Sequence, residues 1–170
     1  MPSPSYEISE DLSSYTIPLS ALSHSYPDHT HLVVGVAITN PQTHKLLIVQ
    51  RSAREDTFPL LYEIPGGHAE PDVDNTILDT VVRETREETG LVVKKVSKQF
   101  EGFEYTNSKG QNTLQLNFLV EVEETGAEKV TLNPEEHQAF AWIDAKDDLD
   151  SFQLSGAMVK VVKDALSLLH

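Results

Sequence analysis

One short stretch decides the fold, and it reads Arg83-Glu84-Thr85-Arg86-Glu87-Glu88-Thr89-Gly90-Leu91. An apolar stripe before it predicts a helix over residues 75–89, with Asp74 as its N-cap and Gly90 just beyond its end. On that helix Glu84, Glu87 and Glu88 are spaced i, i+3 and i+4, so the three carboxylates share one face. Like charges repel at this spacing, and the C-terminal half of a helix disfavours anions. A bound cation offsets both penalties, and hard carboxylate oxygens suit Mg²⁺ or Mn²⁺.

The residues around the glutamates strengthen the prediction of a metal site. Arg83 lies one turn before Glu87 and can hold its carboxylate by a charge-assisted hydrogen bond. Gly66 and Gly67 follow an extended segment and let the backbone approach a ligand closely, so a carbonyl of Gly66 can join the metal shell. A solvated acidic helix face is the alternative for the glutamates taken alone. The arginine and the glycines at these positions favour the metal site over that alternative.

Together these residues resemble the Nudix box, whose pattern is Gly, five residues, Glu, seven residues, then Arg-Glu-apolar-x-Glu-Glu-x-Gly-apolar. Residues 83–91 match its second half, and Pro65-Gly66-Gly67 matches its beginning. Asn75 stands where the family has its first Glu, Thr85 replaces an apolar residue, and the intervening loop is two residues longer. The box is therefore divergent, but it keeps the three glutamates of the metal face.

The resemblance covers residues 30–169 and implies an α/β fold, the Nudix-type α/β/α sandwich with a mixed sheet, the box helix and a C-terminal helix. Residue patterns predict strands at 31–39, 45–50, 58–64, 91–105, 114–123 and 138–143, and a second helix at 155–169. The first two strands are predicted to form a hairpin. Residues 1–13 are predicted to be a flexible tail, and residues 14–170 a single Nudix-like domain.

Composition narrows the classes of function. The 170 residues carry a formal net charge of −14, which argues against a nucleic-acid polymer as partner because that binding uses Lys and Arg. The absence of cysteine excludes disulfides and thiolate sites, and it argues against the family's isoprenoid diphosphate isomerases, which use a catalytic Cys. Without a signal-peptide pattern or a long apolar run, we expect a cytoplasmic protein that does not bind membranes. A homodimer is left open, since dimers are common among Nudix relatives.

The resemblance implies a metal-dependent hydrolase that cleaves the pyrophosphate link of a nucleoside diphosphate derivative, NDP-X, into NMP and P-X, or that acts on a nucleoside triphosphate. Arg83 would orient the carboxylates. A second Glu-bearing loop precedes a strand with Trp142, and either its Glu136 or Glu84 would accept the proton from water. Glu135 is the alternative register for this loop. The implied metal ligands are Gly66, Glu84, Glu87, Glu88 and Glu136, with Mg²⁺ or Mn²⁺ as the cofactor.

Three further residues are candidates for substrate binding. Arg51 and Glu63 lie on strands that lead to the box, where similar positions in the family face the substrate. Phe103 alternates with Tyr105 on a strand and can stack on a base, although packing within the protein is the alternative. The competing function is a catalytically silent Nudix-like module that binds a nucleotide, which the loss of the first box Glu at Asn75 favours.

Overall fold

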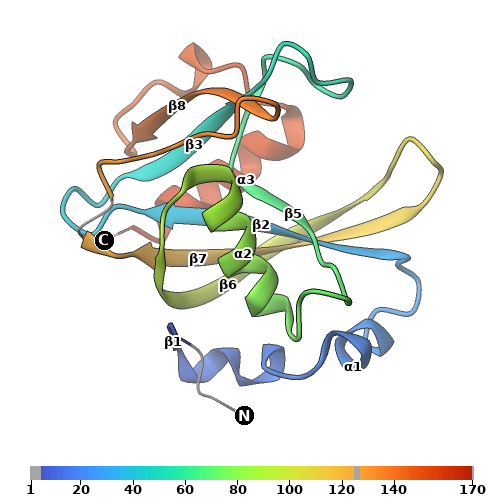
Figure 1. Cartoon of the computed structure of the whole chain (residues 1–170). Helices are drawn as coiled ribbons and strands as arrows, with labels where there is room; N and C mark the ends of the chain where they lie inside the picture. Colours follow the sequence, from blue (N-terminus) through green and yellow to red (C-terminus); the bar gives the residue numbers. More distant parts are fainter. Residues whose placement is uncertain (1–4, 125–126, 170) are drawn as a thin grey trace.

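A mixed β-sheet forms the centre of the computed structural model, which describes residues 5–124 and 127–169 (Figure 1). Its strands run in the order β1-β6-β7-β2-β3-β4, with β5 paired to β2 and β8 paired to β3. Their bounds are β1 Glu7–Ile8, β2 His31–Thr39, β3 Leu46–Arg51, β4 Tyr62–Glu63, β5 Gly66–His68, β6 Val93–Thr106, β7 Asn112–Val122 and β8 His137–Ile143. The pairs β1–β6 and β2–β7 are parallel and the other pairs are antiparallel.

Helices cover both faces of this sheet, as Figure 1 shows for α2 (Ile77–Thr89) and α3 (Gly156–Ser167). The side chains of β2 alternate between two apolar clusters, because successive residues of a strand point to opposite faces. Val36 and Ile38 pack in the cluster that contains α2, whereas Ala37 packs in the cluster that contains α3. The predicted α/β/α sandwich is thereby confirmed, and so are the box helix and the C-terminal helix.

The predicted hairpin forms only at its turn. Residues of β2 and β3 pair at Thr39 and Leu46 alone, and His44 in the turn adopts a left-handed backbone with φ 55°. Beyond that point β2 pairs with β5 and β7, while β3 pairs with β4 and β8. The extended segment predicted at 58–64 contains only the two residues of β4, and Gly66–His68 forms the unpredicted strand β5.

The start of α2 also differs from the prediction. The helix is capped by Thr76 rather than by Asp74, and the Thr76 side chain accepts a hydrogen bond from the backbone amide of Asp79. The Asp79 side chain in turn accepts from the Thr76 amide, which completes a capping box. Asp74 does not cap the helix. It is buried and accepts hydrogen bonds from Arg83.

The N-terminal segment is a second correction, because the described part of residues 1–13 packs onto the domain. Glu7–Ile8 forms β1 beside β6, a 3₁₀ segment follows at Glu10–Tyr15, and the unpredicted helix α1 spans Leu19–His24. Leu12 is only 1% exposed, within the cluster that also holds α2. Burial of apolar side chains thus outweighs the Ser, Pro and acid content of this segment. Among the described residues, no helix has the length and apolar character needed to cross a membrane.

Candidate active site

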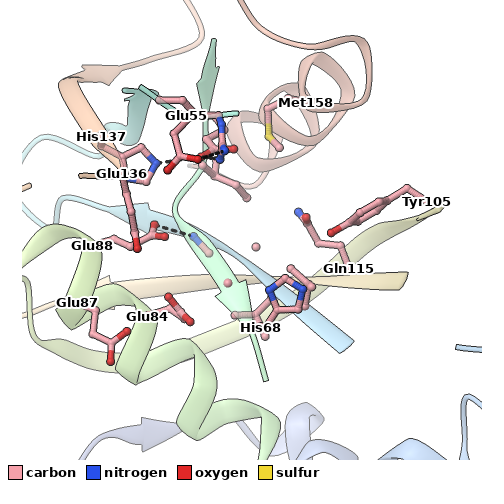
Figure 2. Close-up of a pocket in the computed structure, with 18 of the residues that line it drawn as sticks. Glu55, His68, Glu84, Glu87, Glu88, Tyr105, Gln115, Glu136, His137 and Met158 are labelled. Atoms are coloured by element: carbon pink, nitrogen blue, oxygen red, sulfur yellow. Dashed lines mark hydrogen bonds and ion pairs between the residues drawn. The ribbon is translucent and has the colours of Figure 1, made fainter. Parts of the chain in front are cut away.

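An acidic cleft of about 410 Å³ opens where β2, β3, β5 and α2 meet. Figure 2 shows Glu84, Glu87 and Glu88 on α2, with Glu136 approaching Glu88 from the opposite wall. Arg51 is the one Arg or Lys side chain among the described lining residues. The glutamates that line the cleft are Glu55, Glu63, Glu70, Glu84, Glu87, Glu88 and Glu136. The cleft therefore concentrates negative charge.

The three glutamates of α2 differ in burial although they share a helix face. Glu84 and Glu88 are 8% and 6% exposed, whereas the side chain of Glu87 is 58% exposed. Burial raises the pKa of Glu88 well above its usual range, and the carboxylates of Glu63, Glu84 and Glu136 raise it further. The Gly66 amide donates a hydrogen bond of 3.0 Å to Glu88 Oε2, and this bond lowers the pKa of Glu88. Burial also raises the pKa of Glu84, despite the neighbouring Arg83 cation.

The glycines of β5 pack directly against these carboxylates. A Cβ atom on Gly67 would lie 2.3 Å from Glu84 Cδ, so no larger residue fits without displacing the carboxylate. A Cβ atom on Gly66 would lie 2.0 Å from the carbonyl oxygen of Val34 on the adjacent strand. The backbone of this pair therefore lies close to protein groups, and its close approach to a ligand stays a prediction. Its observed contact is the Gly66 amide on Glu88, and the metal role of the Gly66 carbonyl stays a prediction.

Arg83 links the helix, the loop and the strand through one guanidinium group. Its Nη1 donates to Glu84 Oε1 at 2.9 Å and to Glu87 Oε2 at 3.1 Å, so it holds the carboxylates as predicted. Its Nη2 donates to the backbone oxygen of His68 at 2.9 Å. Its Nε and Nη2 form a bidentate pair with Asp74 at 2.9 Å each, and these bonds raise the pKa of Arg83. The Arg83 guanidinium therefore fixes the carboxylates of Glu84 and Glu87 against β5.

Asp74, which the sequence predicts as a helix cap, instead supports the site through Arg83. It is 3% exposed and also accepts hydrogen bonds from Thr80 Oγ1 and the Glu70 amide. Burial raises the pKa of Asp74, but hydrogen bonds from Arg83, Glu70 and Thr80 outweigh it, so the net pKa is lowered. Asp74 thus supports Arg83 with an acidic group one residue before Asn75. A box alignment that allowed a one-residue shift would have found it.

The second Glu-bearing loop brings Glu136 into the cleft. The Glu136 amide donates to the Asn133 carbonyl oxygen at 3.0 Å, and the Glu136 carbonyl accepts from the Ser52 amide at 2.8 Å. Potential ligand atoms of Glu88, Glu136 and His137 all lie within 4.8 Å of one another. Glu135 is exposed and does not line the cleft. The geometry therefore favours the Glu136 register over the Glu135 register.

Arg51 and Glu63 both line the cleft, and His137, which is not among the residues predicted from the sequence, lines it beside them. Glu63 Oε1 accepts from Arg51 Nη1 at 3.2 Å and lies 2.9 Å from His137 Nε2. Arg51 also donates to Glu55 Oε2 at 3.0 Å, so its charge is shared between two carboxylates. The only sequence signal for His137 was its position next to Glu136, at the start of a strand. This cluster forms the wall opposite α2.

Phe103 does not reach the cleft, which corrects its assignment to the substrate. It packs against the apolar cluster beneath α3, whereas Tyr105 lines the cleft. The two ring centroids are 5.8 Å apart, as expected for residues i and i+2 on one face of a strand. Phe103 is nearer the core and is covered by it, whereas Tyr105 lies closer to the C-terminal end of β6 and reaches the cleft.

The described residues fit a hard divalent cation. Their donor set consists mainly of carboxylate oxygens from two walls, which is the ligand type that Mg²⁺ and Mn²⁺ accept. The raised pKa values of Glu84 and Glu88 also indicate that neighbouring protein groups do not fully compensate their charge. A cation between Glu88 and Glu136 would supply that compensation.

Comparison with known proteins identifies the fold and the family. The MutT protein from Methanosarcina mazei Go1 superimposes with a TM-score of 0.64 at 20% identity, covering 79% of this chain and 91% of that chain. A bifunctional NMN adenylyltransferase/ADP ribose pyrophosphatase from Francisella tularensis, solved with AMP and a Mn ion, gives a TM-score of 0.62 at 18% identity. That match covers 89% of this chain and 45% of the Francisella chain. At these identities the likeness concerns the fold.

Sequence relatives agree with the structural ones. The m7GpppN-mRNA hydrolase NUDT17 from Danio rerio is 42% identical over 59 residues, which are 34% of this chain and 19% of that protein. The match thus spans about a fifth of the length of that curated relative. The model of the NUDIX domain matches residues 29–162, which include strands β2 to β8, α2 and the loop of Glu136. The chain therefore belongs to the NUDIX domain family.

Proposed function

We propose that this chain is a Nudix-type pyrophosphohydrolase that uses Mg²⁺ or Mn²⁺ to cleave NDP-X into NMP and P-X. The acidic cleft carries this proposal. Seven glutamates line it beside Arg51, and the Arg51 charge is already shared with Glu55 and Glu63. Such a cleft repels a diphosphate unless cations are bound in it. Divalent ions neutralise phosphate oxygens and activate water, which are the two requirements of pyrophosphate hydrolysis.

The metal ligands in this proposal are Glu84, Glu87, Glu88 and Glu136, together with the Gly66 carbonyl. Arg83 holds Glu84 and Glu87 in place, and Asp74 holds Arg83. The Gly66 amide fixes one oxygen of Glu88, which leaves the other oxygen for an ion. The chain thus presents carboxylates whose orientation is set before a substrate arrives, which is how preorganised sites lower a barrier.

Glu136 is the proposed proton acceptor for the attacking water. Arg83 restrains Glu84 by a hydrogen bond, whereas no hydrogen bond to the Glu136 carboxylate occurs within the described part of the chain. Glu136 can therefore turn toward a water molecule beside the ions. Glu84 is the alternative acceptor. Arg51 and Glu63 are proposed to contact the substrate from the opposite wall.

The silent nucleotide-binding module is the competing function. Its support was the replacement of the first box Glu by Asn75. Asp74 weakens that support, because its buried carboxylate makes the bidentate contact with Arg83. The silent module also gives no reason for retaining buried, like-charged Glu84 and Glu88. The cytoplasmic location, the absence of a nucleic-acid partner and the homodimer stay predictions.

A substrate panel separates the two functions. Purified protein is incubated with nucleoside triphosphates, dinucleoside polyphosphates, nucleotide sugars, ADP-ribose and dinucleotide cofactors, each with Mg²⁺ or Mn²⁺, and products are identified by chromatography. We expect NMP and P-X from at least one compound, and no product in EDTA or with Glu88→Gln. Binding of a panel compound without turnover in either metal would favour the silent module.

A further inference from the structure

Two buried amide side chains on β7 have no part in the metal face. Gln115 is 8% exposed and Asn117 is 0% exposed. Their apolar neighbours Leu114, Leu116 and Phe118 pack in the cluster that holds α2, so the two amides point to the opposite face of the sheet. Burying amides in a sheet is unfavourable unless their polar atoms form hydrogen bonds. Their placement therefore requires an explanation other than core packing.

A chain of hydrogen bonds fixes the orientation of both amides. Asn117 Nδ2 donates to the Glu101 carbonyl oxygen at 2.8 Å, which leaves Asn117 Oδ1 as an acceptor. Gln115 Nε2 donates to that oxygen at 2.9 Å. Gly35 on β2 leaves room for this pair, since a Cβ there would lie 2.2 Å from Asn117 Oδ1 and 2.5 Å from Gln115 Nε2.

The remaining polar atoms of Gln115 are available to the cleft. Gln115 lines the cleft, and within the described residues no hydrogen bond reaches its Oε1. One hydrogen of its Nε2 is also unused, because a carboxamide nitrogen carries two. The amide therefore offers an acceptor and a donor side by side, in a fixed orientation.

Tyr105 provides an aromatic surface at the same end of the cleft. Figure 2 shows Tyr105 and Gln115 together, on the other side of β5 from Glu84 and Glu87. Tyr105 is 38% exposed, so part of the side chain remains accessible. Burial and the Glu63 carboxylate raise the pKa of Tyr105, so its hydroxyl stays protonated near neutral pH.

We propose that Tyr105 and Gln115 form a nucleobase subsite, with Asn117 as the residue that positions the Gln115 amide. This inference rests on the proposed function, since it assigns the end of the cleft that receives the base of the nucleotide. A Gln amide pairs with a base edge through adjacent donor and acceptor atoms, and an aromatic ring stacks on the base. The sugar and phosphates then extend past β5 toward the carboxylates of α2.

Binding of reaction products tests this subsite without requiring turnover. The affinities of AMP, GMP, CMP, UMP and ribose 5-phosphate are measured by calorimetry in Mg²⁺ for the parent protein, Gln115→Met, Asn117→Leu, Tyr105→Phe and Tyr105→Leu. We expect at least one nucleotide to bind the parent about 5- to 100-fold more tightly than ribose 5-phosphate, the range of stacking on one base. Tyr105→Phe should keep this preference because it keeps the ring.

Gln115→Met, Asn117→Leu and Tyr105→Leu should each reduce the preference for the base while leaving ribose 5-phosphate affinity unchanged. Gln99→Met on neighbouring β6 is the matched control. Among the described residues the Gln99 side chain bonds only the Phe100 carbonyl, and it does not line the cleft. Circular dichroism checks that each variant folds. Because Tyr105 is partly exposed, Tyr105→Leu tests the subsite without replacing a buried residue. The proposal is overturned if no nucleotide exceeds ribose 5-phosphate, or if the preference survives in both Gln115→Met and Tyr105→Leu. A preference for the base without hydrolysis would instead refute only the proposed function.

Discussion

Replacing Asp74 by Asn tests whether this carboxylate supports the site through Arg83. Asp74 accepts two hydrogen bonds of 2.9 Å from Arg83, one of 2.9 Å from Thr80 Oγ1 and one of 3.0 Å from the Glu70 amide. Asn keeps one oxygen acceptor but places an NH₂ group against donors. Hydrogen bonds to a charged group contribute about 1.5–3 kcal/mol each, and breaking a buried ion pair costs about 3–5 kcal/mol.

The expected loss of stability is smaller than for a fully buried pair. The Arg83 side chain is 15% exposed and keeps its bonds to Glu84 and Glu87, so we expect Asp74→Asn to lower the free energy of unfolding by about 2–4 kcal/mol. At this chain length the Tm should fall by about 5–15 °C. Because Arg83 then holds the metal-face carboxylates less firmly, activity should fall by about 10–100-fold.

Thermal and urea unfolding in EDTA measure the loss of stability, and turnover in Mg²⁺ measures the loss of activity. Asp72→Asn is the matched control, since Asp72 is exposed in the same loop. Asn75→Glu, which restores the first box residue, should give no gain in rate because Asp74 already supports Arg83. The reasoning is refuted if Asp74→Asn unfolds and turns over like Asp72→Asn, or if Asn75→Glu markedly raises the rate.

Three further predictions concern the carboxylates of the cleft. Glu87→Gln and Glu88→Gln should each nearly abolish turnover with the fold retained, and Glu88→Gln should raise the Tm of the metal-free protein because it removes a buried charge; full activity in both would exclude the metal face. Because the folded pKa values of Glu84 and Glu88 are raised, the folded state binds more protons, so metal-free stability should fall as pH rises from 4.5 through those values. Mg²⁺ should reduce this loss of stability, which is measured by melting curves at pH 5 and pH 8 with and without Mg²⁺. The same difference in Tm between the two pH values with and without Mg²⁺ would contradict the assignment of the effect to Glu84 and Glu88. Glu136→Gln should lower kcat by about 10²–10⁴ with KM little changed, whereas Glu135→Gln should not, and the reverse result would shift the register by one residue.

The fold was predictable where local pattern and tertiary packing agree. Residues 32–38 of β2 form an apolar run rich in β-branched side chains, and the strand has the predicted bounds. The end of α2 at Gly90 was likewise predictable, because Gly90 takes the left-handed φ of 71° that ends many helices. In β2 the apolar, β-branched residues favour a strand and also fill the core. At Gly90 the glycine permits the left-handed backbone that ends the helix.

The errors occurred where distant partners decide the structure. Two chemically suitable caps, Asp74 and Thr76, precede α2. Asp74 instead accepts hydrogen bonds from Arg83, Thr80 and the Glu70 amide, which are contacts that cap chemistry does not predict. Leu12 is buried by a surface that its own segment does not contain. His137 lies beside Glu63, which is 74 residues away in sequence. No local pattern contains the contacts of Leu12 and His137.

In the proposed function, ions on the Glu84–Glu88 face support attack of water on a pyrophosphate phosphorus. Hydrolysis of the panel compounds in ¹⁸O-labelled water, followed by mass spectrometry of both products, detects this attack. We predict that for at least one compound a single ¹⁸O enters NMP or P-X only when Mg²⁺ or Mn²⁺ is present, and that Glu88→Gln prevents it. No ¹⁸O in either product with either metal, or the same labelling in Glu88→Gln, would contradict this role of the ions.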